Sequence, residues 1–142
     1  MRLVLDTAIM VAVIRSHHGA SNRILTACFQ KRAQILVSVP LMMEYEAVMS
    51  RTEHLKASGL TQPDIAALLD ELATVLIPVE LAFLGRPNLP DADDDMVLET
   101  AANGAADALV TFNKRDFAAI APKFGIAVLS PGEALRRMEL VK

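Results

Sequence analysis

Short apolar runs with strand character alternate with helical segments along the chain, and this order constrains the fold more than any other feature. The strand-like runs are rich in Leu, Ile and Val, as in strands that are buried on both faces of a parallel sheet. They lie at residues 2–6, 34–38, 75–80, 108–112 and 126–130. The sequence therefore predicts an α/β fold in which helices cover both faces of a mostly parallel sheet of four to five strands.

Prolines and capping residues support the element boundaries. Pro40 occupies a first helical turn, where proline is tolerated, and Thr61 is placed to cap a helix. Gly104 is a natural helix stop, and Pro78 places its strand at the edge of the sheet. The expected helices cover residues 8–15, 22–32, 40–51, 61–75, 93–104, 114–121 and 131–140.

Length and composition favour one domain, taken as residues 1–142, in a reducing cytoplasm. The chain is 53% hydrophobic and 22% charged, which is enough apolar material for a core. The apolar N-terminal run is interrupted by Asp6 and is too short to span a bilayer, so we expect no membrane or targeting segment. The single cysteine, Cys28, cannot form an internal disulfide.

Four acidic side chains are expected at the carboxyl-terminal edge of the sheet, where parallel α/β proteins bind their ligands. They follow strands or begin helices at that edge: Asp6, Glu44, Asp94 and Asp116. Carboxylates that converge in this way need a cation, and sites made only of oxygen ligands suit Mg²⁺ or Mn²⁺. None of the three histidines is near these segments in the sequence, which disfavours zinc.

The net charge of −3 does not exclude nucleic acid as a substrate. If four of the 17 acidic residues hold metal, 13 remain against 14 Lys and Arg, a balance of +1. A basic balance is what nucleic-acid binding generally requires.

Some of these acids have simpler interpretations. Asp6 could cap the helix that begins near Ala8, and Asp116 could pair with Lys114 or Arg115. Helix-start electrostatics explain one or two aspartates of the run 91–95, but not all four.

We therefore expect Asp91 and Asp93 in loop or cap positions, and Asp94 or Asp95 facing a metal. Glu44 is preferred to Glu46 as the helical acid because it lies closer to the helix start.

Four segments, taken in order, resemble the PIN-domain nucleases. They read "LVLDTAIMVAVI", "LVSVPLMMEYEAVMSR", "LPDADDDMVLETAANGAADALVTFNKRDF" and "FGIAVLSPGEAL". The similarity is greatest to the prokaryotic branch of toxin components of toxin–antitoxin pairs, which are related to the VapC toxins. It implies a three-layer α/β/α sandwich that cleaves phosphodiester bonds of RNA with Mg²⁺ or Mn²⁺. It further implies a cognate antitoxin as a partner and a homodimer.

The resemblance also implies roles for individual residues. The catalytic acids would be Asp6, Glu44, Asp94 and Asp116, and the metal ligands would add Asp95 and Asn113. One position departs from the family pattern, which reads Asp-Thr-Asn or Asp-Ser-Asn where this chain has Asp-Thr-Ala, with Ala8 last. Loss of a side chain that orients the ligands weakens metal affinity by about 10–100-fold.

Two other interpretations are compatible with the residues. A degenerate PIN domain would bind RNA or a protein partner without cleaving. A receiver-type signalling domain also gathers aspartates at strand ends, but it needs a lysine after its last strand, where this chain reads "PGEAL".

Overall fold

The computed structural model describes residues 1–16, 19–82, 89 and 92–138, so His17, His18 and Asp91 lie outside the described residues. Its sheet has five strands in the order β3-β2-β1-β4-β5, and every pairing between neighbours is parallel. The strands are β1 Arg2–Leu5, β2 Gln34–Val37, β3 Ile77–Pro78, β4 Ala108–Val110 and β5 Ala127–Leu129. The five predicted strands are therefore all present, each shorter than expected, and β3 lies at an edge.

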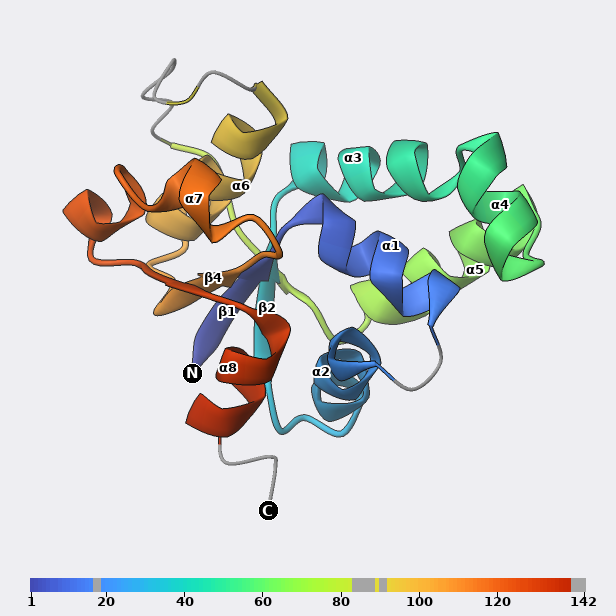
Figure 1. Cartoon of the computed structure of the whole chain (residues 1–142), viewed down its shortest axis with the longest axis horizontal. Coiled ribbons are helices and arrows are strands. Elements are labelled where there is room, and N and C mark those ends of the chain that lie inside the picture. The colour runs from blue at the N-terminus through green and yellow to red at the C-terminus, as the bar shows by residue number, and fades with distance from the viewer. Residues whose placement is uncertain (17–18, 83–88, 90–91, 139–142) are drawn as a thin grey trace.

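Helices surround this sheet in a three-layer α/β/α arrangement, which confirms the predicted fold class (Figure 1). α6 packs on β1, β2 and β4, whereas α8 packs on β5 and α2. The helices are α1 Thr7–Arg15, α2 Ala20–Phe29, α3 Val39–Met49, α4 Thr52–Ser58, α5 Gln62–Ala73, α6 Ala92–Asn103, α7 Lys114–Phe117 and α8 Pro131–Arg137, with a 3-10 helix at Ala121–Phe124.

Side-chain caps begin four of these helices, α1, α3, α5 and α8. Ser38 accepts a hydrogen bond from the backbone N–H of Leu41 at the start of α3. Thr61 forms a reciprocal capping box with Asp64, as its position predicted, and Ser130 forms another with Glu133. Each box provides partners for backbone N–H groups that a helix start leaves without intrahelical acceptors.

Three helical predictions were wrong in extent or missing. The helix expected over 22–32 ends at Phe29, because Lys31 has a positive φ of 60° that no helix can continue through. The helix expected over 114–121 is split into α7 and the 3-10 helix. α4 was not predicted at all, since its seven residues carry no apolar repeat and none of them is buried.

The core lies between the sheet and α6, α3 and α1. Leu3, Val4 and Leu5 of β1 are at most 1% exposed, as expected for a central strand covered on both faces. Gly104 follows α6 where a Cβ atom would lie 2.8 Å from side-chain carbons of Leu36 and Val79. Only glycine allows α6 to end this close to β2 and β3.

Within the described residues, no helix is both long enough and apolar enough to cross a lipid bilayer.

Candidate active site

A hollow of about 270 Å³ opens where β1 ends, and three acidic side chains from three different elements line it. These are Asp6 after β1, Glu44 on α3 and Asp93 on α6. The other lining residues are Thr7, Ala8, Val11, Val48, Arg51 and His54. Strand β1 ends beside the starts of α1 and α3, which lie side by side (Figure 1). The topology therefore brings residues from distant parts of the chain to one place.

Asp6 is held by two hydrogen bonds and is only 8% exposed. Its Oδ1 accepts from the backbone N–H of Thr7 at 2.8 Å, so it occupies the N-cap position of α1. Its Oδ2 accepts from the hydroxyl of Thr111 at 2.7 Å, across from the end of β4. Asp6 therefore caps α1 and also lines the hollow.

Tyr45 fixes α3 against β1 and thereby positions its neighbour Glu44. The hydroxyl of Tyr45 donates a 2.5 Å hydrogen bond to the backbone carbonyl of Leu5, one residue before Asp6. Burial raises the pKa of Tyr45 well above its usual range, and the nearby negative charge of Asp6 raises it further. Glu46, the rival acid on this helix, is exposed and does not line the hollow.

The aspartate run enters the hollow through Asp93, which sequence reasoning had assigned to a loop or cap position. Asp93 is exposed and lines the hollow, whereas Asp94 is half-buried and is not part of the lining. Asp95 is 2% exposed. α6 begins at Ala92, so the first helical turn displays these three consecutive side chains in three directions.

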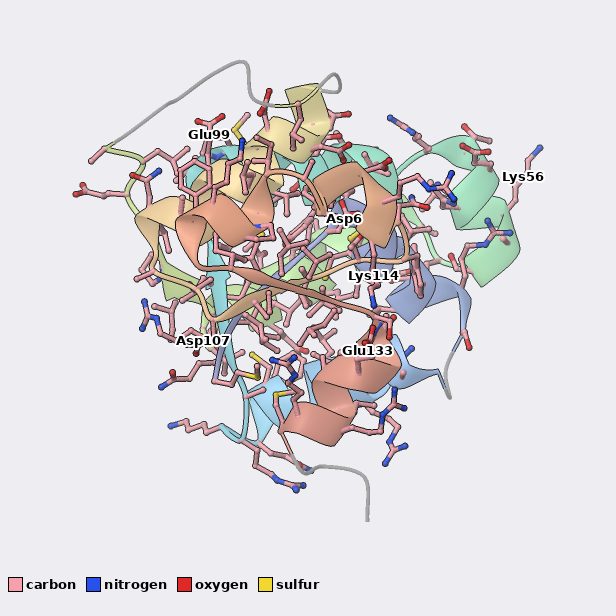
Figure 2. The ribbon with its side chains drawn as sticks, turned by 60° about the vertical axis from the view of Figure 1, so that its left-hand side comes forward. Asp6, Lys56, Glu99, Asp107, Lys114 and Glu133 are labelled. Atoms are coloured by element: carbon pink, nitrogen blue, oxygen red, sulfur yellow. The ribbon has the colours of Figure 1, made fainter. Side chains whose placement is uncertain are left out.

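Asp116 and Asn113 lie on exposed backbone just past β4 and are not part of the lining. The backbone N–H of Asn113 donates to the hydroxyl oxygen of Thr111 at 3.0 Å, which links this segment to Asp6. Lys114 does not pair with Asp116. Its Nζ atom lies 2.7 Å from Oε1 of Glu133, and Figure 2 shows the two side chains side by side.

Two basic side chains in the lining were missed. Arg51 and His54 come from the start of α4, which carries no periodic signal in the sequence. His54 is distant from most of the acids in the sequence, but the contact between α1 and α4 brings it to the hollow, which the expectation against a histidine ligand did not foresee.

Glu99 is a further buried acid that sequence reasoning missed. It is 4% exposed and lies one helical turn after Asp95 on α6. It does not line the hollow, and Figure 2 shows it well separated from Asp6. The i, i+4 spacing of two acids on one helix is the signal that could have identified it.

The lining matches a hard divalent cation in donor chemistry. Its acids supply carboxylate oxygens, the ligands that Mg²⁺ and Mn²⁺ prefer. The hydroxyl oxygen of Thr7 is buried in the same lining and has no hydrogen-bond partner among the described residues. As placed in the described part of the chain, no three His, Cys, Asp or Glu side chains lie close enough together to ligate one ion. The hollow therefore offers the right donor types for a divalent cation in one place, but the described acids that line it are not close enough together to ligate one ion.

Comparison with known proteins agrees with the fold. The family model of the PIN domain matches residues 2–115. A crystal structure of VapBC2 from Rickettsia felis, bound to a DNA fragment from its promoter, contains a chain with the same fold. The match has a TM-score of 0.62 at 17% identity and covers 92% of this chain and 98% of that one. No curated protein matches the sequence. Because the family model spans most of its length, the chain belongs to the PIN domain family.

Proposed function

We propose that this protein is a metal-dependent endoribonuclease that hydrolyses phosphodiester bonds in RNA. The observation that carries the proposal is the convergence of Asp6, Glu44 and Asp93 on one hollow at the ligand-binding edge of a PIN domain. The three carboxylates come from distant parts of the chain and repel one another, so their shared position calls for a compensating reason. A cation that they hold together, and that binds a phosphate in turn, supplies such a reason.

Mg²⁺ or Mn²⁺ would bind in this hollow and draw Asp6, Glu44 and Asp93 closer together than they lie here. The bound ion would lower the pKa of a water molecule and offset the negative charge of the phosphate. The chain's own contribution is orientation: Thr111 and the Thr7 N–H fix both oxygens of Asp6. Tyr45 fixes the helix that carries Glu44.

The other metal ligands expected from the sequence lie outside the lining of the hollow, so we do not place them on the ion itself. Asp94 and Asp95 follow Asp93 on α6, and Asp116 and Asn113 follow β4 beside Thr111. Because they are not in the lining, we assign them to the surroundings of the ion and of the RNA strand.

We further propose that the protein acts in the cytoplasm as the toxin of a toxin–antitoxin pair, restrained by an antitoxin, and that it forms a homodimer. The fold shared with a chain of VapBC2 supports the first part. An exposed apolar surface supports the second: Val39 and Met43 of α3 are 74% and 68% exposed. Val39 also lines an apolar hollow of about 390 Å³.

A cleavage assay with a matched pair of variants tests the nuclease proposal. Asp6→Asn removes the charge of a hollow-lining acid, and Glu46→Gln removes one from an exposed acid on α3. With Mn²⁺ and single-stranded RNA, we expect Asp6→Asn to lose at least about 100-fold in rate and Glu46→Gln to retain it. EDTA should abolish cleavage by the unaltered protein. Equal cleavage by all three proteins would reject the role of Asp6.

A PIN domain that binds without cleaving is the second candidate, and Ala8 is the observation that favours it. Ala8 lines the hollow at the position where the family pattern has an amide. Thermal unfolding with and without millimolar Mn²⁺ separates the two candidates. A working site raises the melting temperature by mass action, and an unchanged temperature would favour the non-cleaving domain.

A further inference from the structure

We propose that Arg51 and His54 form a phosphate-binding subsite on the α4 side of the hollow. This subsite would hold the RNA strand at a phosphate next to the one that is cleaved. The inference rests on the proposed nuclease function, because it assigns a substrate contact within the same hollow.

Arg51 is a cation that the surrounding acids do not neutralise. It lines the hollow together with Asp6, Glu44 and Asp93, yet it forms no ion pair within the part of the chain that the structure describes. Arg51 is exposed, and although it precedes α4, its side chain makes no capping hydrogen bond to that helix. The guanidinium group therefore retains its donors for a ligand, and its planar geometry suits two oxygens of one phosphate.

His54 stands one helical turn further along α4, on the same lining. Its Nδ1 atom is buried and has no hydrogen-bond partner among the described residues. Its Nε2 atom lies 3.8 Å from Oε1 of Glu53, which is too far for a hydrogen bond. The ring is mostly buried, and no hydrogen bond to another described residue gives it a structural role.

RNA needs positive charge at this hollow for an electrostatic reason. The three acids of the lining repel an incoming phosphodiester strand. Arg51 and His54 both come from the start of one short helix, so the charge of Arg51 and the ring nitrogens of His54 lie on one side of the hollow. A strand that crosses the hollow can place one phosphate near the acids and a neighbouring phosphate against α4.

The chain contains a matched control on the same helix. Lys56 of α4 is exposed and does not line the hollow, and Figure 2 shows its side chain projecting away from the body of the molecule. Arg51→Gln and Lys56→Gln each remove one positive charge from α4, so they leave the same net charge. Only the first removes it from the hollow.

Binding is measured with the full chain in EDTA, where cleavage cannot interfere. The probe is a fluorescein-labelled single-stranded RNA, and its anisotropy gives the affinity at several salt concentrations. We expect Arg51→Gln to reduce the slope of log affinity against log salt by about 0.7, the value for one phosphate contact on a single strand. At 0.1 M salt this corresponds to about a five-fold weaker affinity. Lys56→Gln should keep both the slope and the affinity.

A second measurement separates contact with RNA from an effect on folding or on the metal. In Mn²⁺-dependent cleavage, Arg51→Gln should raise KM more than it lowers kcat, and His54→Gln should act in the same direction. Equal affinities and slopes for the Arg51 and Lys56 variants would overturn the subsite, as would an unaltered chain that does not bind the probe. The proposed function fails by a different result, namely the absence of metal-dependent cleavage by the unaltered chain.

Discussion

The hydroxyl of Thr111 donates a 2.7 Å hydrogen bond to Oδ2 of Asp6, although 105 residues separate the two in the chain. Thr111 is fully buried, so this bond is shielded from water. It couples the end of β4 to the end of β1 at the point where the hollow begins. A threonine that follows a buried strand thus orients an acid of the proposed metal site.

Thr111→Val should therefore impair the site while keeping the side chain's shape. Removing the donor takes one hydrogen bond from the buried carboxylate of Asp6, which should lower the free energy of unfolding by about 1–3 kcal/mol. Cleavage should fall by about 10–100-fold. Thr111→Ser keeps the hydroxyl and is the control for both urea unfolding and cleavage. A Val variant that is as stable and as active as the Ser variant would show that the hydrogen bond to Asp6 does not matter.

Ser38→Ala should destabilise the fold more than Thr61→Ala does. Ser38 caps α3, and its buried hydroxyl oxygen lies 2.7 Å from the hydroxyl oxygen of Thr100 on α6. Thr61 caps α5 in an exposed capping box. We expect losses in the free energy of unfolding of about 2 kcal/mol for Ser38→Ala and about 1 kcal/mol for Thr61→Ala. Urea unfolding followed by circular dichroism measures both, and the reverse order would contradict the role of the Ser38–Thr100 pair.

Glu133 should make stability depend on pH in the acid range. Its hydrogen bond from Lys114, together with bonds from Ser130, lowers its pKa from 4.5 to about 2. A group with a lowered folded-state pKa stabilises the fold fully above its unfolded pKa, and this contribution disappears as pH falls through the folded value. Between pH 4.5 and 2, Glu133→Gln should therefore have a flatter stability profile than the unaltered chain. An NMR titration of Glu133 gives the pKa directly, and an ordinary value there would contradict the prediction.

Asp93 and Asp94 can be compared directly as metal ligands. Asp93 lines the hollow and Asp94 does not, so Asp93→Asn should weaken Mn²⁺ binding at least about ten-fold, while Asp94→Asn should have less effect. At saturating metal, a ten-fold loss removes about 1.4 kcal/mol of stabilisation, which is about 4 °C of the metal-induced rise in melting temperature. Differential scanning fluorimetry with and without Mn²⁺ reads this difference. A larger loss in the Asp94 variant would restore the assignment made from the sequence.

The fold followed from the sequence because its signals are local and repeated. Leu3 to Leu5 read as a strand covered on both faces, and each of them is at most 1% exposed. Pro78 cannot donate a backbone hydrogen bond, which places β3 at the edge. α4 escaped prediction because Leu55 and His54 are only half-buried, and its position depends on packing against α1 rather than on periodicity.

The site could be predicted only to the level of its elements. Each residue turns a helix by about 100°, so the rotation of α6 against its neighbours decides which of Asp93 and Asp94 faces the hollow, and the sequence does not give that rotation. α6 begins at Ala92, one residue before the predicted start. His54 could not be assigned either, because its place depends on a contact between distant helices.

Ala8→Asn should strengthen metal binding if the departure from the family pattern is what weakens the site. Ala8 is exposed in the lining next to Thr7, so a larger side chain has room to extend into the hollow. An amide there can donate hydrogen bonds to neighbouring carboxylates, and such orienting bonds are worth about 10–100-fold in metal affinity. We expect the Mn²⁺ titration midpoint to fall by about that factor and cleavage to rise in parallel. Ala8→Leu, which fills similar space without donors, is the control. If both variants bind Mn²⁺ like the unaltered chain, Ala8 does not limit the site, and the non-cleaving interpretation loses its main support.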